Sequence, residues 1–478
     1  GQDLMKLGYR AIIVKGQPAD RDKRWALDVT EEGASLKEVP DCKGMWNYAL
    51  IDHLAKSYSK DASFVSIGPA GELQLKGASV ACTDQDNRYP ARHASRGGMG
   101  AVMGAKGLKF VAVEPGRAKL RRAAKHAEYT ELCKRYGADY LAGEQFFSEG
   151  TAIGVTFANS LHSLPYKNRI DGQSPNADTL DGYLIHESFA TRGGGMHNCL
   201  TGCIVRCSNV VHDKEGEYKT SALEFETLTM LGSNCAIANW EDVADLDRLC
   251  DDIGLDTIET GAAVAVYMDA GGMEFGDAEG TKQLLREIAE GTEIGRAIGN
   301  GAAAVGRVKK HHRVPTVKGQ AIPAWDPRPL KAAGVTYCTS AMGADHTAGL
   351  VVDPGQAPEE FARASQESQI LNAAVDASGF CQFLMPNIEE VSEFYSTFRG
   401  AAITREELAD QGWQCLEDEW EFNRRAGFGP EDDKMAACMA EDEIGDQTKF
   451  VWDVPDEVVA SAYERFEPRD ELYTARPS

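Results

Sequence analysis

The stretch NWEDVADLDRLCDDIGLDTIETGAAVAV, residues 239–266, decides the fold of the central part of the chain. Asn239 is a helix N-cap, and apolar residues then recur at helical spacing until Gly254, a residue type that often ends a helix. Asp256 is the N-cap of a second helix. The stretch therefore predicts two helices joined by a tight turn at residues 251–257, where three carboxylates come together.

The chain changes character on either side of this helix pair. Short β-branched and aromatic runs, separated by Gly and Pro, predict strands at 9–14, 26–29, 64–67 and 109–113. Residues 118–136 predict a helix, and helical patterns alternate with loops from there to the end. We therefore expect an α+β protein, with a β-rich N-terminal part followed by mainly helical parts.

The composition excludes several classes of protein. The 478 residues carry 50 Lys and Arg against 74 Asp and Glu, a formal net charge of −24, which is not the basic footprint of a nucleic-acid-binding protein. The longest apolar run, 262–268, is far shorter than the roughly 20 residues that span a membrane. The chain opens without a leader peptide and so abruptly that we expect a missing N-terminal piece. We predict a cytoplasmic protein.

Three of the twelve cysteines are crowded into the segment CLTGCIVRC, at positions 199, 203 and 207. A spacing of four residues would place them on one face of a helix, so three core cysteines are one interpretation. Clustered thiolates also bind zinc or an iron–sulfur cluster. A structural zinc site usually takes paired CxxC units, and no second pair is present. Three close cysteines plus a distant one suit a [4Fe–4S] cluster better.

A glycine-rich segment, SRGGMGAVMG at residues 95–104, is the second candidate site. Backbone N–H groups of Gly97 and Gly98 can approach an anionic ligand closely, and Arg96 can add charge-assisted hydrogen bonds. The segment precedes a predicted strand, whereas a dinucleotide-binding fingerprint follows a strand and opens a helix. A simple glycine turn is the alternative.

Two acidic corners, residues 251–256 and DASGFC at 376–381, complete the set. A carboxylate beside a cluster cysteine disfavours adding an electron to the cluster. It is useful there if it accepts N–H bonds from a heterocycle next to the cluster. Helix capping alone would also explain either corner.

Together these motifs resemble the tungsten- or molybdenum-containing aldehyde ferredoxin oxidoreductases. The resemblance is carried, in the family's order and over nearly the whole chain, by GPAGE (68–72), RGGMGAVMG (96–104), the three cysteines, LEFETLTMLGSN (223–234), DDIGLDT (251–257), GADH (343–346) and the D-x4-C ending at residue 381. It implies a [4Fe–4S] cluster, a tungsten or molybdenum bis-pyranopterin, and Mg²⁺ bridging the pterin phosphates.

The resemblance also implies a role for each matched residue. The cluster would be held by Cys199, Cys203, Cys207 and Cys381, although the family usually has two residues between its first two cysteines and this chain has three. One pterin would be bound by Asp251, Asp256 and Asp376, and the other pterin or the bridged phosphates by Arg96, Gly97 and Gly98. Glu226 and His346 would transfer protons beside the metal. Without the resemblance, Glu226 would be interpreted as a surface acid and His346 as a core histidine.

The same resemblance divides the chain into three domains. Residues 1–115 would be an incomplete β-rich pterin-binding domain, 116–317 a helical domain with three cluster cysteines and a pterin-binding corner, and 318–478 a helical domain with the fourth cysteine. Segments 325–328 and 337–339 would line the substrate cavity. The implied reaction is oxidation of an aldehyde to a carboxylic acid by an oxygen-sensitive enzyme.

Partners and rival functions follow from the same observations. Nine Lys or Arg lie between residues 106 and 135, which favours docking of an acidic ferredoxin or a ferredoxin-like subunit, although a solvated helix face explains them equally well. The family implies a homodimer or a hetero-oligomer. Low-potential reduction of an aromatic acyl-CoA with the same cofactors is one alternative function. An electron-transfer subunit without the pterin is the other.

Overall fold

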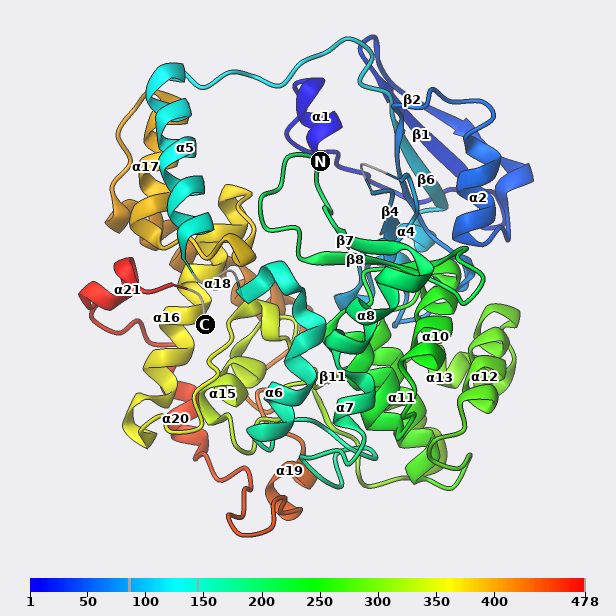
Figure 1. The fold of residues 1–478 in the computed structure, drawn as a ribbon, viewed down its shortest axis with the longest axis vertical. Helices are drawn as coiled ribbons and strands as arrows, with labels where there is room; N and C mark the ends of the chain where they lie inside the picture. The colour runs from blue at the N-terminus through cyan, green and yellow to red at the C-terminus, as the bar shows by residue number, and fades with distance from the viewer. Residues whose placement is uncertain (85–86, 144–145, 477–478) are drawn as a thin grey trace. The chain divides into compact units, whose positions relative to one another are not determined.

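The computed structural model describes residues 1–84, 87–143 and 146–476, and the chain forms two compact units. Unit 1 comprises Gly1–Arg121, Gly150–Ile153 and Thr179–His311, and unit 2 comprises Arg122–Glu149, Gly154–Asp178 and His312–Ser478. Unit 1 holds a six-stranded and a three-stranded sheet, and unit 2 is mainly helical (Figure 1). The predicted α+β class is confirmed. The division into three domains stays a prediction.

A six-stranded sheet organises the N-terminal part of unit 1. The strand order is β2-β1-β6-β3-β4-β5, and β1 and β6 pair in parallel while the other neighbours pair antiparallel. The strands are β1 Trp25–Thr30, β2 Gly33–Glu38, β3 Ser63–Ser66, β4 Val80–Cys82, β5 Arg92–Ala94 and β6 Leu108–Val113. Three of the four predicted strands are therefore confirmed, and their predicted ends differ from the observed ends by no more than one residue.

Side chains of the central strand β6 alternate between two apolar layers. Phe110 and Ala112 pack against helix α2 (Asn47–Leu54), which lies along the sheet in Figure 1. Val111 and Val113 belong to the layer on the opposite face. The sheet is thus covered on both faces, which is why β6 reads as a continuous apolar run.

Two expectations for the N-terminal part are wrong. Residues 9–14 are irregular and mostly exposed, since their backbone pairs with no described strand. The helix expected from residue 118 is α5, His126–Ala142, and residues 116–125 before it are a loop. Arg, Lys and Ala dominate that loop and have high helix propensity, but only Ala123 is buried, so no tertiary packing supports a helix there.

The central helix pair is confirmed together with its caps. Helix α10 spans Trp240–Ile253, and the Asn239 side chain accepts a hydrogen bond from the Glu241 N–H at 3.0 Å. Gly254 ends the helix with a left-handed φ of 80°. Helix α11 spans Thr257–Asp269, and Asp256 Oδ1 accepts a hydrogen bond from the Ile258 N–H at 2.9 Å.

The turn between α10 and α11 is fixed to the sheet by backbone hydrogen bonds. Ser79 N–H donates to Gly254 O, and Asp256 N–H donates to Gly77 O, both at 2.9 Å. Gly68 lies so close on the other side that a Cβ there would stand 2.2 Å from Ile253 O. The acidic corner is therefore held rigidly beside the entry to β4.

The core of unit 2 is built on helix α16, Phe361–Ser378. It packs against α15 (Lys331–Thr339) and α18 (Arg405–Ala426), and α16 and α18 run side by side in Figure 1. Trp420 of α18 donates its indole N–H to Thr339 O at 2.9 Å. Unit 2 also contains helix α17, Ile388–Arg399, which begins with a capping box.

A fully buried ion triad also stabilises unit 2. Arg169, Asp326 and Arg328 are all 0% exposed. Asp326 accepts hydrogen bonds from Arg169 Nη1 at 3.0 Å and from Arg328 Nε and Nη2 at 2.9 and 2.8 Å. Burial opposes ionisation of this carboxyl, but Arg328 and Arg169 outweigh it and lower the pKa of Asp326 to about 2. Asp326 and Arg328 thus have a structural role, and a substrate cavity lined by this segment stays a prediction.

Removing the acid of this triad is expected to destabilise the protein strongly. Asp326→Ala leaves two guanidinium groups buried without an anion, which typically costs about 3–5 kcal/mol. Asp453→Ala is the control, since Asp453 pairs with Lys331 with its side chain 65% exposed, and its loss should cost less than about 1 kcal/mol. Chemical denaturation of both variants measures the difference. Equal midpoints would contradict this role of the triad.

Candidate functional site

The three clustered cysteines lie in the loop of a β-hairpin in unit 1. Strand β7 (Gly194–His197) pairs antiparallel with β8 (Ser208–His212), which pairs with β9 (Tyr218–Ser221). Residues 198–207 connect β7 to β8 without a helix, so the interpretation as three cysteines on a helix face is wrong. Cys199 is exposed, and Cys203 and Cys207 are half-buried. Core packing therefore does not explain them.

The geometry of the described residues does not show a metal site directly. Among them, no group of three His, Cys, Asp or Glu side chains is arranged to hold a metal ion. Cys381 belongs to unit 2, as the exposed N-cap of the short helix Gln382–Leu384. A cluster held by Cys199, Cys203, Cys207 and Cys381 therefore stays a prediction.

Arg92 of β5 is a cation beside this loop that the sequence did not reveal as a site residue. Its Nη1 donates to Ser208 Oγ at 2.6 Å, one residue after Cys207. Its Nε and Nη2 are buried and have no hydrogen-bond partner in the described part of the chain. Desolvation raises the pKa of the Cys199 thiol, and the positive charge of Arg92 opposes that rise. Unfilled buried donors are costly, so the site fits a bound anionic group such as a thiolate-ligated cluster.

The acidic corner brings Asp251 into a polar network. His93 Nε2 lies 3.1 Å from Asp251 Oδ1, and the Tyr48 hydroxyl donates to Asp251 Oδ2 at 3.4 Å. Burial, and then the charge of Asp251, raise the pKa of Tyr48, so the hydroxyl stays protonated and donates. Both carboxylate oxygens keep unused lone pairs, which suits a carboxylate that accepts N–H bonds from a heterocycle.

A second buried acid, Asp247, stands one helical turn before Asp251. Burial raises the pKa of Asp247 well above its ordinary value, and the charge of Asp251 raises it further. Thr220 Oγ1 donates to Asp247 Oδ2 at 2.7 Å. Burial beside a second carboxyl therefore disfavours the charged form of Asp247.

The glycine-rich segment differs from its predicted form. It precedes β6, as predicted, but it also follows β5 and opens the short helix α4, Met99–Ala105, so the predicted contrast with a segment that follows a strand and opens a helix is wrong. Gly97 and Gly98 have left-handed φ values of 77° and 68°, and a Cβ on Gly98 would stand 2.7 Å from Lys76 O. Arg96 Nε lies 3.5 Å from Asp256 Oδ2, which joins this segment to the acidic corner. The two predicted pterin-binding elements of unit 1 are thus neighbours.

Glu226 is half-buried in the three-residue helix α9, Phe225–Thr227, so it is not the surface acid of the alternative interpretation. A π-helical turn, Leu228–Gly232, follows it, and such turns occur frequently at functional sites. The hydroxyls of Thr227 and Thr257 are hydrogen-bonded at 2.9 Å, and Thr257 follows Asp256. Helix α9, which carries Glu226, is thereby joined to the start of α11, directly after Asp256.

The two remaining predicted residues belong to unit 2. His346 begins a short helix, His346–Ala348, and its side chain is 20% exposed, so it is not a buried core histidine. Asp376 lies in the last turn of α16, and burial raises the pKa of its carboxyl. Their roles beside the residues of unit 1 stay predictions.

Four residues of unit 1 were missed by the sequence analysis: Tyr48, Arg92, His93 and Asp247. Only Asp247 carried a usable signal, because it lies four residues before Asp251 on one predicted helix. Arg92 lies in strand β5, where a spacing of four residues to Arg96 indicates no shared face. Tyr48 reaches Asp251 from 203 residues away, and the sequence contains nothing that indicates this contact.

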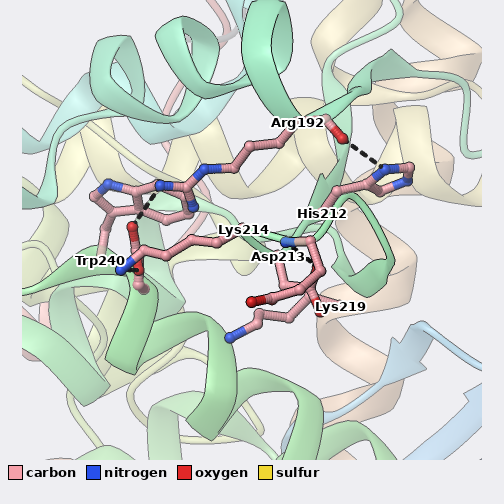
Figure 2. Close-up of a pocket in the computed structure, with 8 residues that line it drawn as sticks. Arg192, His212, Asp213, Lys214, Lys219 and Trp240 are labelled. Carbon is pink, nitrogen blue, oxygen red and sulfur yellow. Dashed lines mark hydrogen bonds and ion pairs between the residues drawn. The ribbon is translucent and has the colours of Figure 1, made fainter.

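A surface pocket of about 100 Å³ in unit 1 is not the candidate site. Figure 2 shows Arg192 and Lys214 at this pocket, both bonded to Glu241, at 2.7 and 2.9 Å. The Arg192 guanidinium also lies 5.4 Å from the centre of the Trp240 ring. Both cations are therefore paired with an acid of the protein itself. The pocket also lies at the opposite end of β8 from the cysteine loop.

Comparison with known proteins defines the class. The model of domains 2 and 3 of aldehyde ferredoxin oxidoreductase matches residues 120–467, and the model of its N-terminal domain matches residues 1–115. The chain belongs to the aldehyde ferredoxin oxidoreductase family and is an oxidoreductase. None of the helices in the described ranges is both long and apolar enough to cross a membrane.

Individual relatives agree with this assignment. The chain is 27% identical to the tungsten-containing aldehyde ferredoxin oxidoreductase of Pyrococcus furiosus, over 93% of this chain and 76% of the relative. It is 24% identical to the WOR-like subunit of an aliphatic sulfonate oxidoreductase from the same organism, over 86% and 68%. The BamBC active-site complex of benzoyl coenzyme A reductase shares the fold, with a TM-score of 0.73 at 17% identity over 91% of this chain and 76% of that chain.

Proposed function

We propose that this oxidoreductase carries a tungsten or molybdenum bis-pyranopterin and one [4Fe–4S] cluster, and oxidises aldehydes to carboxylic acids. The observation that carries the proposal is the loop of three cysteines beside an Arg92 whose buried donors are unfilled. Relatives described as tungsten-containing support the choice of metal. The cluster would then pass electrons to a ferredoxin or a partner subunit.

The residues of the candidate site suit an iron–sulfur cluster and two pterins. Cys199, Cys203 and Cys207, with Cys381, would hold the cluster, and Arg92 supplies an unpaired positive charge for it. One pterin would be bound by Asp251 and Asp256, together with Asp376. The other pterin, or phosphates bridged by Mg²⁺, would lie on Arg96, Gly97 and Gly98, where two left-handed glycines keep side chains out of the way.

In this proposal two side chains handle protons. Aldehyde oxidation adds a water oxygen to the carbonyl carbon and releases electrons and protons. The bound cofactor supplies the electron-accepting chemistry. Glu226 accepts a proton from the attacking water, and His346 donates a hydrogen bond to the carbonyl oxygen. Burial raises the pKa of Asp247, which disfavours additional negative charge at the acidic corner.

The partner surface that we propose is narrower than the stretch 106–135. Lys109 is fully buried and paired with Glu72 at 2.6 Å, so it contributes nothing to a surface. Lys134 and Arg135 pair with Glu131 and Glu393.

The exposed cations on the loop before α5 are Arg117, Lys119, Arg121, Arg122 and Lys125, of which Lys125 pairs with Glu128 at 3.7 Å. Because the loop is not helical, the interpretation as a solvated helix face does not apply to it. On a chain of net charge −24, this loop would attract an acidic ferredoxin.

Metal analysis of the anaerobically purified protein tests the proposal. We expect about four Fe and about one W or Mo per chain. We also expect reduction of a viologen dye by aldehydes. Iron without W or Mo would favour the electron-transfer subunit. A full metal complement without aldehyde turnover would favour reduction of an aromatic acyl-CoA. Zinc alone would contradict the cofactor assignment.

A further inference from the structure

We propose that Arg92 is a positioning residue for the iron–sulfur cluster, whose Nε–H and Nη2–H groups donate to its anionic sulfur atoms and raise its reduction potential. This inference rests on the proposed function, because it requires the cluster. It concerns a residue outside the cysteine, glycine-loop and acidic motifs.

The first argument is the unfilled hydrogen-bonding capacity of Arg92. A guanidinium group has five N–H donors, and its Nη1 reaches the Ser208 hydroxyl at 2.6 Å. The Nε and Nη2 atoms are buried and have no hydrogen-bond partner in the described ranges. A protein rarely leaves such donors buried and unfilled, so a group absent from the polypeptide itself is expected to accept them.

The second argument is charge. The Nη1 group of Arg92 donates to a neutral hydroxyl, that of Ser208, and its buried Nε and Nη2 groups donate to no carboxylate in the described ranges. A buried charge is costly without a counter-ion, so the guanidinium is suited to pair with an anion that the protein binds.

The third argument is position. Ser208, the hydroxyl partner of Arg92, directly follows Cys207 and pairs with His197, two residues before Cys199, so it stands where both ends of the cysteine loop meet. Arg92 therefore lies beside the residues proposed to hold the cluster. One-electron reduction adds a negative charge to an already anionic cluster. A nearby buried cation and its N–H groups stabilise the reduced form, which raises the potential.

A redox titration followed by electron paramagnetic resonance tests this inference. Arg92→Gln removes the charge, and Arg206→Gln is the matched control. Arg206 precedes Cys207 directly but is exposed, so solvent screens its charge. We expect the cluster midpoint of Arg92→Gln to become more negative, that of Arg206→Gln to remain at the wild-type value, and that of Arg92→Lys to lie between them.

Several outcomes would overturn the inference. One is a wild-type midpoint in Arg92→Gln with a full iron content. Another is an equal shift in both glutamine variants. Loss of tungsten or molybdenum with an unchanged midpoint would assign Arg92 to the pterin instead. If the Arg92→Gln variant does not assemble its cluster, the Arg92→Lys variant is the test. A wild-type cluster midpoint in Arg92→Lys would overturn the proposed N–H donation.

The titration uses a chemical reductant and no aldehyde. It therefore remains valid if the proposed substrate is wrong, whereas a wild-type protein without iron would refute the proposed function itself.

Discussion

Replacing Cys203 by Ser should remove the iron–sulfur cluster and with it all dye reduction. A serine hydroxyl is a much poorer ligand for iron than a thiolate, and Cys203 is the central cysteine of the hairpin loop. We expect iron to fall from about four atoms per chain to a small residue, and the visible absorption of the cluster to disappear. Elemental analysis and absorption spectra of the anaerobically purified variant measure both effects.

Cys133→Ser is the matched control for that experiment. Cys133 is exposed on helix α5 and lies in neither of the cysteine motifs, so its replacement should leave iron content and dye reduction unchanged. A Cys203→Ser variant with a full iron content would refute the ligand set. Equal iron loss in both variants would point to a general effect on folding and would count against a specific role of Cys203.

Elements with local signals were predicted well from the sequence. The pair α10 and α11 carries its own caps, at Asn239, Gly254 and Asp256, so its boundaries follow from neighbouring residues alone. The segment 9–14 is β-branched and apolar like a strand, but a strand also needs a partner, and partners are not encoded locally. Residues 118–125 fail similarly, because a short helix needs a surface to pack on.

The candidate site was predictable only where it follows motifs. The cysteines, the glycine loop and the acidic corner each lie within a few consecutive residues. Lys109 shows the limit of this reasoning, because it resembles a surface cation in the sequence and is a buried partner of Glu72. Arg92 shows the opposite case, because it lies outside every sequence motif and is nevertheless a residue of the candidate site. Its importance depends on the pairing of β5 with β4 and on contacts with a hairpin more than 100 residues further along the chain.

Glu226→Gln should lower aldehyde turnover by about 10²- to 10⁴-fold with full iron and tungsten or molybdenum contents, which is the range for loss of a general base. Glutamine keeps the size of the side chain but cannot accept the proton from the attacking water. The contact of Thr227 with Thr257 should survive, so α9 is expected to stay in place. Anaerobic steady-state assays at saturating aldehyde, with metal content measured on the same samples, give the effect on kcat.

Two further variants separate proton transfer from structure at this position. Glu226→Asp keeps a carboxylate on a shorter side chain, so we expect partial activity, well above that of Glu226→Gln. Glu279→Gln changes an acid whose side chain is 82% exposed on helix α12 (Ala278–Glu290), and it should match the wild type. If Glu226→Gln turns over aldehyde at the wild-type rate, Glu226 is not the base. Equal losses in the Asp and Gln variants would mean that side-chain length, and not proton acceptance, decides activity at this position.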